Sequence, residues 1–270
     1  MNLLNSINWG SFGIVLAILA VLAIIFTILI LVINRFCAVE EDPKIGMIAS
    51  NLSGANCGGC GFAGCADFAK ALVEGRAQIG SCSATASENK QIIAQILGQT
   101  VEDNEPMISV IMCAGSNDIA KKRLNYIGNN SCEAISMTVG NDKVCTYGCI
   151  GGGTCVAHCT FSGISVNDGV AINTPSTCTG CGVCVKKCPK QVIGLIPKSA
   201  KVYVACSSKC KGKEVMDACK VGCIACGLCM KNCPENAITI VDNLPVIDYS
   251  KCSGCKTCVI KCPRKTIKEL

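Results

Sequence analysis

The segment Cys252-Ser-Gly-Cys255-Lys-Thr-Cys258-Val-Ile-Lys-Cys262-Pro263 decides how the C-terminal half of this chain folds. Its spacing is C-x2-C-x2-C-x3-C-P, in which three thiolates hold one [4Fe–4S] cube and the fourth cysteine ligates a neighbouring cube. The same spacing begins again at Cys178 and at Cys223. The three motifs therefore predict cubane clusters arranged in pairs.

Working outward from this segment, the cysteines repeat with a period of 74 residues. A shift of 74 positions places nine cysteines on nine others, and such self-similarity indicates a duplicated structural unit. The pairs are Cys132 and Cys206, Cys145 and Cys219, Cys149 and Cys223, Cys155 and Cys229, Cys159 and Cys233, Cys178 and Cys252, Cys181 and Cys255, Cys184 and Cys258, and Cys188 and Cys262. Short aliphatic runs follow the motif prolines, so each unit is predicted to be a small α+β, ferredoxin-like domain that holds two clusters.

Composition favours metal centres over disulfides. The 270 residues include 26 cysteines, which by number alone would also fit a secreted disulfide scaffold. Cysteines two residues apart are poorly placed to pair with each other, but their sulfurs converge easily on one metal centre. Thiolate clusters need a reducing compartment, so most of the chain is expected on the cytoplasmic side of a membrane. Aromatic residues make up only 4% of the chain, so clusters are expected to replace part of the hydrophobic core.

The N-terminal segment predicts a membrane anchor. No charged residue occurs from Ile7 to Ile33, and the 21 residues of 13–33 would form roughly 31 Å of helix, enough to span the hydrocarbon layer. Trp9 is placed for an interfacial anchor, and every Lys and Arg follows from Arg35 onward. We therefore expect a single pass through the inner (cytoplasmic) membrane, with the N-terminus outside and the iron–sulfur domains inside. A cleaved signal peptide is the alternative, but the apolar stretch is too long and its basic residues come after it.

A second kind of metal motif follows the anchor, with the spacing C-x2-C-x4-C-x16-C. Its ligands are Cys57, Cys60, Cys65 and Cys82. Residues 66–74 have apolar positions at helical spacing, and this helix would return the chain so that the last cysteine closes the site. Zinc also accepts four cysteines, but zinc ribbons usually present two matched knuckles and this motif has one. A [4Fe–4S] cluster is therefore favoured over zinc.

The first two-cluster domain has one regular and one irregular set of ligands. The regular cube is expected on Cys159, Cys178, Cys181 and Cys184. The other cube needs Cys188 and three upstream ligands, but Gly152 stands where an ordinary motif has its middle cysteine. We expect Cys145 to supply the missing thiolate, with Cys149, Cys155 and Cys188.

In the second domain both ligand sets are regular. One cube is expected on Cys223, Cys226, Cys229 and Cys262, and the other on Cys233, Cys252, Cys255 and Cys258. Cys226 fills the position that Gly152 leaves empty, so Cys219 becomes surplus even though it is the counterpart of Cys145. The choice between Cys219 and Cys226 is open, and we take Cys226.

This assignment gives five [4Fe–4S] clusters. The cysteines left without a role are Cys37, Cys113, Cys132, Cys206, Cys210 and Cys219. A spare cysteine is more often a small buried hydrophobe than a ligand, but a sixth cluster that draws on these residues is an open alternative.

The expected domains are an anchor (1–36), a four-cysteine [4Fe–4S] domain (37–100), a linker or small α+β segment (101–141), and two two-cluster domains (142–200 and 201–270). Within the linker, residues 107–112 are expected to form a buried strand and residues 118–126 a short basic helix. The sole histidine, His158, is unrepeated and is interpreted as a polar loop residue. The sequence lacks a nucleotide-binding glycine motif and a set of catalytic side chains, so we expect flavin or nicotinamide chemistry to come from another subunit.

The anchor, the Cys57 motif and the cubes that follow together resemble the RnfB family of the Rnf electron transport complex, over essentially the whole chain. The tandem repeat resembles the long clostridial and acetogen type. The resemblance implies an electron-relay subunit of a membrane-bound ferredoxin:NAD⁺ oxidoreductase that pumps Na⁺ or H⁺. It also implies soluble ferredoxin as electron donor, membrane, flavin-bearing and NAD-binding subunits as partners, and no nucleic acid.

The formal net charge of +6 fits an acidic ferredoxin as partner, since a basic face speeds encounter. Basic residues near the cubes are Lys186, Lys187, Lys190, Lys209, Lys211, Lys213, Lys256, Lys261, Arg264 and Lys265. Two other functions are weighed: a membrane-tethered polyferredoxin that serves a hydrogenase or formate dehydrogenase, and a zinc-rich scaffold. The identity of the neighbouring subunits would distinguish the polyferredoxin. The colour of the protein would distinguish the zinc-rich scaffold, because cubes are brown and zinc proteins are colourless.

Overall fold

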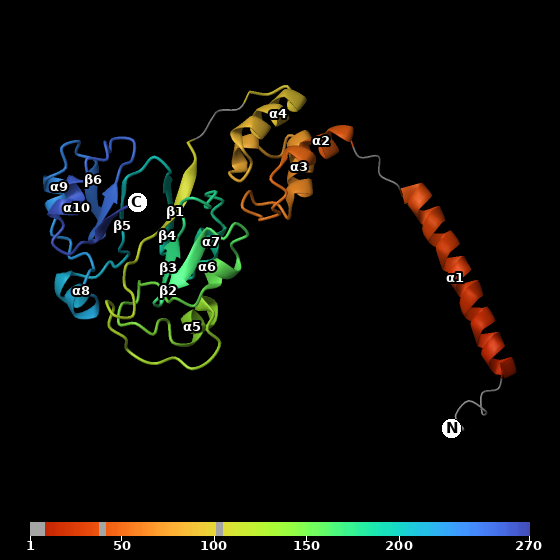
Figure 1. Cartoon of the computed structure of the whole chain (residues 1–270), viewed down its shortest axis with the longest axis horizontal. Coiled ribbons are helices and arrows are strands. Elements are labelled where there is room, and N and C mark those ends of the chain that lie inside the picture. Colours follow the sequence, from red (N-terminus) through yellow and green to blue (C-terminus); the bar gives the residue numbers. More distant parts are fainter. Residues whose placement is uncertain (1–8, 38–41, 101–104) are drawn as a thin grey trace. The chain divides into compact units, whose positions relative to one another are not determined.

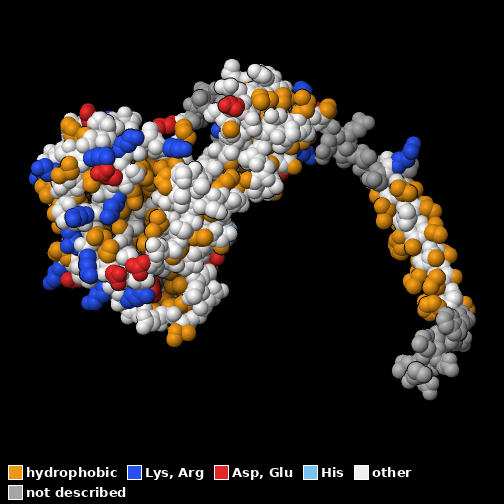
Figure 2. Space-filling view, viewed as in Figure 1, with side chains coloured by type: hydrophobic (Ala, Val, Ile, Leu, Met, Phe, Trp, Pro, Cys, Tyr) orange, Lys and Arg blue, Asp and Glu red, His pale blue; other side chains and the backbone are white. Residues whose placement is uncertain are grey.

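The computed structural model describes residues 9–37, 42–100 and 105–270. Residues 44–270 form one compact unit, and the N-terminal helix belongs to the other. Helix α1 (Trp9–Cys37) contains 22 residues, Phe12–Ile33, that are long and apolar enough to cross a membrane, with none of their window buried in the protein. Hydrophobic side chains cover its length (Figure 2), as expected for a helix surrounded by lipid.

Three helices and a short 3₁₀ turn build the segment that carries the first cysteine motif (Figure 1). They are α2 (Pro43–Asn51), α3 (Cys65–Val73), η2 (Ile79–Ser81) and α4 (Ser87–Leu97). The predicted helix after Cys65 is confirmed. Its apolar face packs Phe68 and Leu72 against Ile48 and Ile93, and these four side chains are almost completely buried.

The rest of the compact unit contains two related α+β domains. The first comprises β1 (Met107–Ile111), α5 (Cys132–Thr138), α6 (Thr154–Ala157), β2 (Ile164–Asn167), β3 (Val170–Asn173), α7 (Val183–Lys187) and β4 (Ile193–Pro197). The second comprises β5 (Val202–Val204), α8 (Gly212–Ala218), α9 (Leu228–Lys231), β6 (Ile238–Val241), β7 (Leu244–Ile247), α10 (Thr257–Lys261) and β8 (Ile267–Glu269). The α+β architecture expected from the sequence is present.

Each domain has the same two antiparallel ribbons. Hairpin β2–β3 corresponds to β6–β7, and the long-range pair β1–β4 corresponds to β5–β8. Strand β1 was expected within a linker, but it pairs along its whole length with β4 and completes the first domain. The expected strand at 107–112 is thus confirmed. The expected helix at 118–126 is wrong: residues 117–119 form a turn, and Ala120 and Lys122 then form isolated β-bridges. Amides beyond the turn bond to other loops, as Lys121 does to Ala218.

Four buried cysteines belong to the hydrophobic cores of the two domains. Cys149 and Cys155 pack with Ile164 and Val192 in the first domain, and Cys229 and Cys258 pack with Ile238 and Ile267 in the second. Aliphatic side chains from the ribbons thus cover one side of the ligand loops. In each domain, the residues that form the hydrophobic core therefore also surround the cysteines that are expected to bind the clusters.

Candidate iron–sulfur sites

The four cysteines of the first motif surround one cavity. Cys57, Cys60, Cys65 and Cys82 all line it, together with Phe68. Helix α3 begins at Cys65, whose amide donates to the Asn56 side chain over 2.8 Å, and η2 brings Cys82 back to the same place. Burial raises the pKa of the Cys60 thiol.

Three further cavities lie at the regular cube motifs. Each is lined by the four cysteines grouped from the sequence: Cys159, Cys178, Cys181 and Cys184; Cys223, Cys226, Cys229 and Cys262; and Cys233, Cys252, Cys255 and Cys258. In each set one ligand comes from a distant motif, so the two motifs of a domain interlock. Cys226 lines one of these cavities, whereas Cys219 lines a different one.

Helices α6, α7, α9 and α10 carry ligands in their first turn or just beyond their last. Residues in left-handed conformation precede them, such as Gly227 at φ 71° and Lys256 at φ 61°. Backbone amides also point at sulfur: the amide of Thr266 donates to Cys262 Sγ over 3.3 Å. Burial opposes ionisation of Cys262, but such amides outweigh it and lower the pKa of this thiol.

The irregular cube site differs from the sequence-based expectation. Cys155 lies close to Cys149, Cys132 and Cys188, whereas Cys145 lines a separate cavity with Cys113 and Cys206. Cys132, at the start of α5, is buried, and its amide donates to the Thr154 hydroxyl over 2.9 Å at the start of α6. The geometry therefore favours Cys132, not Cys145, as the fourth ligand of this cube.

Gly152 shows why no cysteine stands at the middle position of this motif. A Cβ atom at Gly152 would lie 2.1 Å from the Asn130 carbonyl oxygen and 2.7 Å from the Cys132 nitrogen. The chain that carries Cys132 therefore occupies the space of the missing side chain. The sequence offered a signal for this swap, because Cys132 was a spare cysteine in the stretch just before the irregular motif.

Burial keeps the thiols of this region neutral when no iron is bound. It raises the pKa of Cys149 to about 11, that of Cys155 to about 12 and that of Cys184 to about 11, with neighbouring cysteines adding to the effect. Iron binds the thiolate, so cluster assembly must displace these protons.

Zinc and an iron–sulfur cube require different arrangements of four cysteines. In the described ranges, no three Cys, His, Asp or Glu side chains converge closely enough to hold a single metal ion. A tetrahedral zinc site with bonds of about 2.3 Å would need sulfurs about 3.8 Å apart. In a cube each thiolate binds a different iron, so its four cysteines need not converge on one ion.

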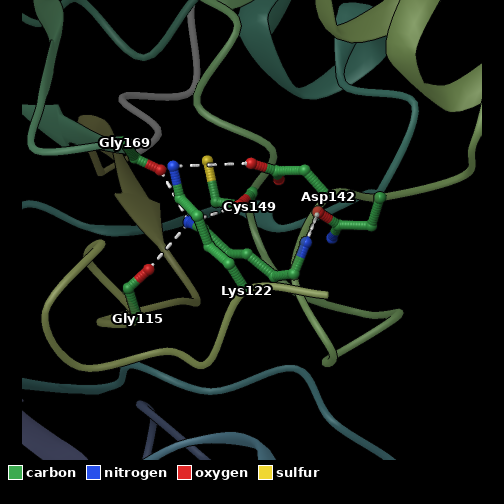
Figure 3. Close-up of polar contacts among 7 residues, drawn as sticks. Gly115, Lys122, Asp142, Cys149 and Gly169 are labelled. Atoms are coloured by element: carbon green, nitrogen blue, oxygen red, sulfur yellow. Dashed lines mark hydrogen bonds and ion pairs between the residues drawn. The ribbon is translucent and has the colours of Figure 1, made fainter. Parts of the chain in front are cut away.

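A buried lysine lies beside the irregular site. Lys143 is 1% exposed, and its ammonium donates to the carbonyls of Gly115 (2.8 Å), Cys149 (2.8 Å) and Gly169 (2.7 Å). Figure 3 labels these three acceptor residues. It ties three loops together and places a positive charge next to anionic ligands. Sequence reasoning missed Lys143, whose repeat counterpart is Asp217.

His158 is a helix-capping residue. It follows the last residue of α6, and its Nδ1 lies 2.9 Å from the carbonyl of Thr154 in the same helix. Its counterpart Asn232 follows α9 and donates to the Leu228 carbonyl over 2.8 Å. The two repeats thus use different side chains for the same contact. This accords with the interpretation of His158 as a polar, non-ligating residue.

The surplus cysteines have three different fates. Cys132 lies at the irregular cube, and Cys113, Cys206, Cys210 and Cys219 line a separate cavity together with Cys145. The side chains of Cys37 and Trp9 lie outside the described residues.

Comparison with known sequence families identifies the same three regions. Residues 52–84 match a family described as "Putative Fe-S cluster", residues 173–194 a "4Fe-4S binding domain" and residues 222–266 a "4Fe-4S dicluster domain". The first match favours iron over zinc at the Cys57 motif. The chain therefore contains iron–sulfur binding domains of the 4Fe–4S type.

Individual relatives extend the comparison to nearly the whole chain. The B component of the Na⁺-translocating ferredoxin:NAD⁺ oxidoreductase complex of Acetobacterium woodii is 38% identical over 90% of this chain and 73% of its own length. The B component of the ion-translocating oxidoreductase complex of Methanosarcina acetivorans is 40% identical over 89% of this chain and 92% of its own. This chain belongs to the RnfB family. A third member, from the proton-translocating complex of Clostridium ljungdahlii, is 38% identical over 91% of this chain and 88% of its own. The resemblance noted from the cysteine motifs is confirmed.

Proposed function

We propose that this RnfB-family chain is the iron–sulfur electron-relay subunit of a membrane-bound, ion-translocating ferredoxin:NAD⁺ oxidoreductase. The observation that carries the proposal is the joint presence of clustered cysteine sites and near full-length similarity to the B components of such complexes. The clusters supply one-electron chemistry when bound, and the chain's own residues hold them, shield them and set their spacing.

Five [4Fe–4S] clusters are assigned from the motifs, with one change of ligand. Cys132 replaces Cys145 and completes the cube of Cys149, Cys155 and Cys188. The other four sets remain as grouped from the sequence, because each lines its own cavity.

Electron entry is assigned to the second two-cluster domain. Cys226 and Cys255, one from each of its cubes, are the exposed ligands among the cysteines whose exposure the structure describes. Residues 201–270 contain 12 Lys and Arg against six Asp and Glu, so the whole net charge of +6 belongs to this domain. Basic side chains are spread over it in Figure 2, in the part that Figure 1 colours blue. An acidic ferredoxin would be steered toward these exposed cluster edges.

Electron exit toward the membrane is assigned to the Cys57 site. Cys181 of the first two-cluster domain lines the same cavity as Cys57, and the ammonium of Lys186 donates to the Gly59 carbonyl over 3.1 Å. A Cβ at Gly59 would lie 2.6 Å from the Cys181 carbonyl oxygen, so glycine permits this close approach. Two ligand loops in contact provide a short path between their clusters.

The apolar helix α1 anchors the chain in a single pass. Arg35 follows the span directly, and the basic residues beyond it favour a cytoplasmic location for the iron–sulfur domains. The N-terminus then lies on the opposite side.

Purification of the intact complex tests the proposal. A tag on this chain should recover flavin-bearing and NAD-binding partners from anaerobically solubilised membranes, and the preparation should reduce NAD⁺ with reduced ferredoxin. Membranes from a strain that lacks the chain should lose this activity. Recovery of a nickel or molybdenum enzyme instead, or full activity without the chain, would overturn the assignment.

A further inference from the structure

One cavity in the described part of the chain has no role in the five-cluster assignment. It measures about 190 Å³, compared with 10 to 20 Å³ for the cavities at the four regular sites. Residues from both two-cluster domains line it, and five of them are cysteines: Cys113, Cys145, Cys206, Cys210 and Cys219. Its size and lining therefore suit a further inorganic cofactor.

Four of these cysteines form two structurally equivalent pairs. Cys145 and Cys219 are related by the 74-residue repeat. Cys113 and Cys206 are not, yet each lies two residues beyond an equivalent strand, β1 or β5. Each domain therefore contributes two cysteines at equivalent places, the first domain Cys113 and Cys145 and the second domain Cys206 and Cys219.

Hydrogen bonds to sulfur confirm that Cys113 and Cys206 occupy equivalent places. The amide of Cys149 donates to Cys113 Sγ over 3.3 Å, and the amide of Cys223 donates to Cys206 Sγ over 3.4 Å. Cys149 and Cys223 are themselves repeat counterparts. Amide donors of this kind stabilise a thiolate and are common around cluster sulfurs.

The two pairs converge because the domains are joined at this point. The Ala114 amide donates to the Ala205 carbonyl over 3.1 Å, and Ala120 forms a β-bridge with Cys219. A Cβ placed on Gly115 would lie 3.6 Å from Cys113 Sγ and 3.8 Å from Cys219 Sγ, so both sulfurs lie within 4 Å of one point. Cys145 is close enough to both Cys113 and Cys206 for their charges to act on it.

The surroundings of this cavity suit an anionic cluster. Lys143 lines the same cavity and brings a buried positive charge. The fifth cysteine of the cavity, Cys210, belongs to neither of the two equivalent pairs.

We propose that Cys113, Cys145, Cys206 and Cys219 bind a sixth [4Fe–4S] cluster between the two two-cluster domains. Each domain supplies two ligands, so the cluster cross-links them. The loops of Cys149 and Cys223, which hold ligands of the adjacent cubes, donate directly to its sulfurs. It would accept one electron from one adjacent cube and pass it to the other, so no further reactant is required. The ligand assignment does not depend on which protein donates the electrons.

Native mass spectrometry of the full chain, purified anaerobically, tests the proposal directly. Six cubes give about 24 irons and 24 sulfides per chain, whereas five give about 20 of each. The double substitution Cys113→Ser and Cys206→Ser should remove about four irons and four sulfides, and Cys210→Ser, from the same cavity, should remove none. A wild-type mass with five cubes, one zinc ion per chain, or an unchanged iron content in the double variant would overturn it. If the double variant fails to fold, the wild-type mass decides alone.

Discussion

Lys143 should be a main determinant of stability in the first two-cluster domain. Its ammonium is 1% exposed and donates to three carbonyls over 2.7 to 2.8 Å. Hydrogen bonds from a charged donor contribute roughly 1.5–3 kcal/mol each, so Lys143→Met should lower the free energy of unfolding by at least about 4 kcal/mol. The substitution keeps the apolar length of the side chain and removes its hydrogen bonds.

The loss of stability can be measured as the rate at which the full chain unfolds in guanidinium under anaerobic conditions. The loss of cluster absorbance reports this unfolding. Since about 1.4 kcal/mol corresponds to a tenfold change, Lys143→Met should lose its clusters well over tenfold faster than the wild type. Lys122→Met is the matched control. Lys122 is 43% exposed and lies 3.9 Å from the Asp142 carboxylate (Figure 3), a surface pair worth about 0–1 kcal/mol. A rate for Lys143→Met within threefold of the control would refute the reasoning.

Gly152→Ala should displace the chain around Asn130 and lower the iron content by about four irons per chain. Gly46→Ala is the control, because its added methyl group meets no neighbouring atom and should leave the iron content unchanged. Equal iron content in the two variants would contradict the role of Gly152. Ferredoxin-dependent reduction should slow steeply between about 0.05 and 0.5 M salt, and Lys261→Glu should slow it more than Lys90→Glu outside the basic domain; a rate flat across salt would exclude steering. Removal of iron by a chelator should reduce helical circular dichroism. Burial raises the pKa of Cys155 to about 12, against about 8.5 for a thiol in the unfolded chain. The contribution of this neutral thiol to the free energy of unfolding of the apoprotein should therefore be complete below about pH 8.5 and should fall as the pH rises. The cluster-bound chain should lack this trend.

Much of this fold could be predicted from spacing, because cluster ligation imposes strict local geometry. The spacing of the Cys252 motif predicted that Cys252, Cys255 and Cys258 lie around one site, and they line one cavity. The aliphatic runs after the prolines form β4 and β6 as expected. The segment 118–126 could not be predicted in this way. It has helix-forming residues, but beyond a turn at 117–119 its backbone bonds to loops that are distant in sequence.

The irregular cube shows a limit of repeat-based reasoning. Alignment at 74 residues paired Cys145 with Cys219 correctly, but it offered no reason for Gly152 until the path of residues 130–132 was known. It also paired Cys132 with Cys206, whereas the structural equivalent of Cys206 is Cys113. An insertion before Cys145 shifts the alignment of the two repeats. The correct alignment follows from the equivalent places of β1, which pairs with β4, and β5, which pairs with β8.

The most direct test of the central claim is rapid mixing of the oxidised full chain with reduced ferredoxin under anaerobic conditions. The relay function predicts that ferredoxin bleaches the cluster absorbance of this chain and that dithionite adds little further bleaching. Clusters that dithionite reduces but ferredoxin leaves oxidised would contradict it.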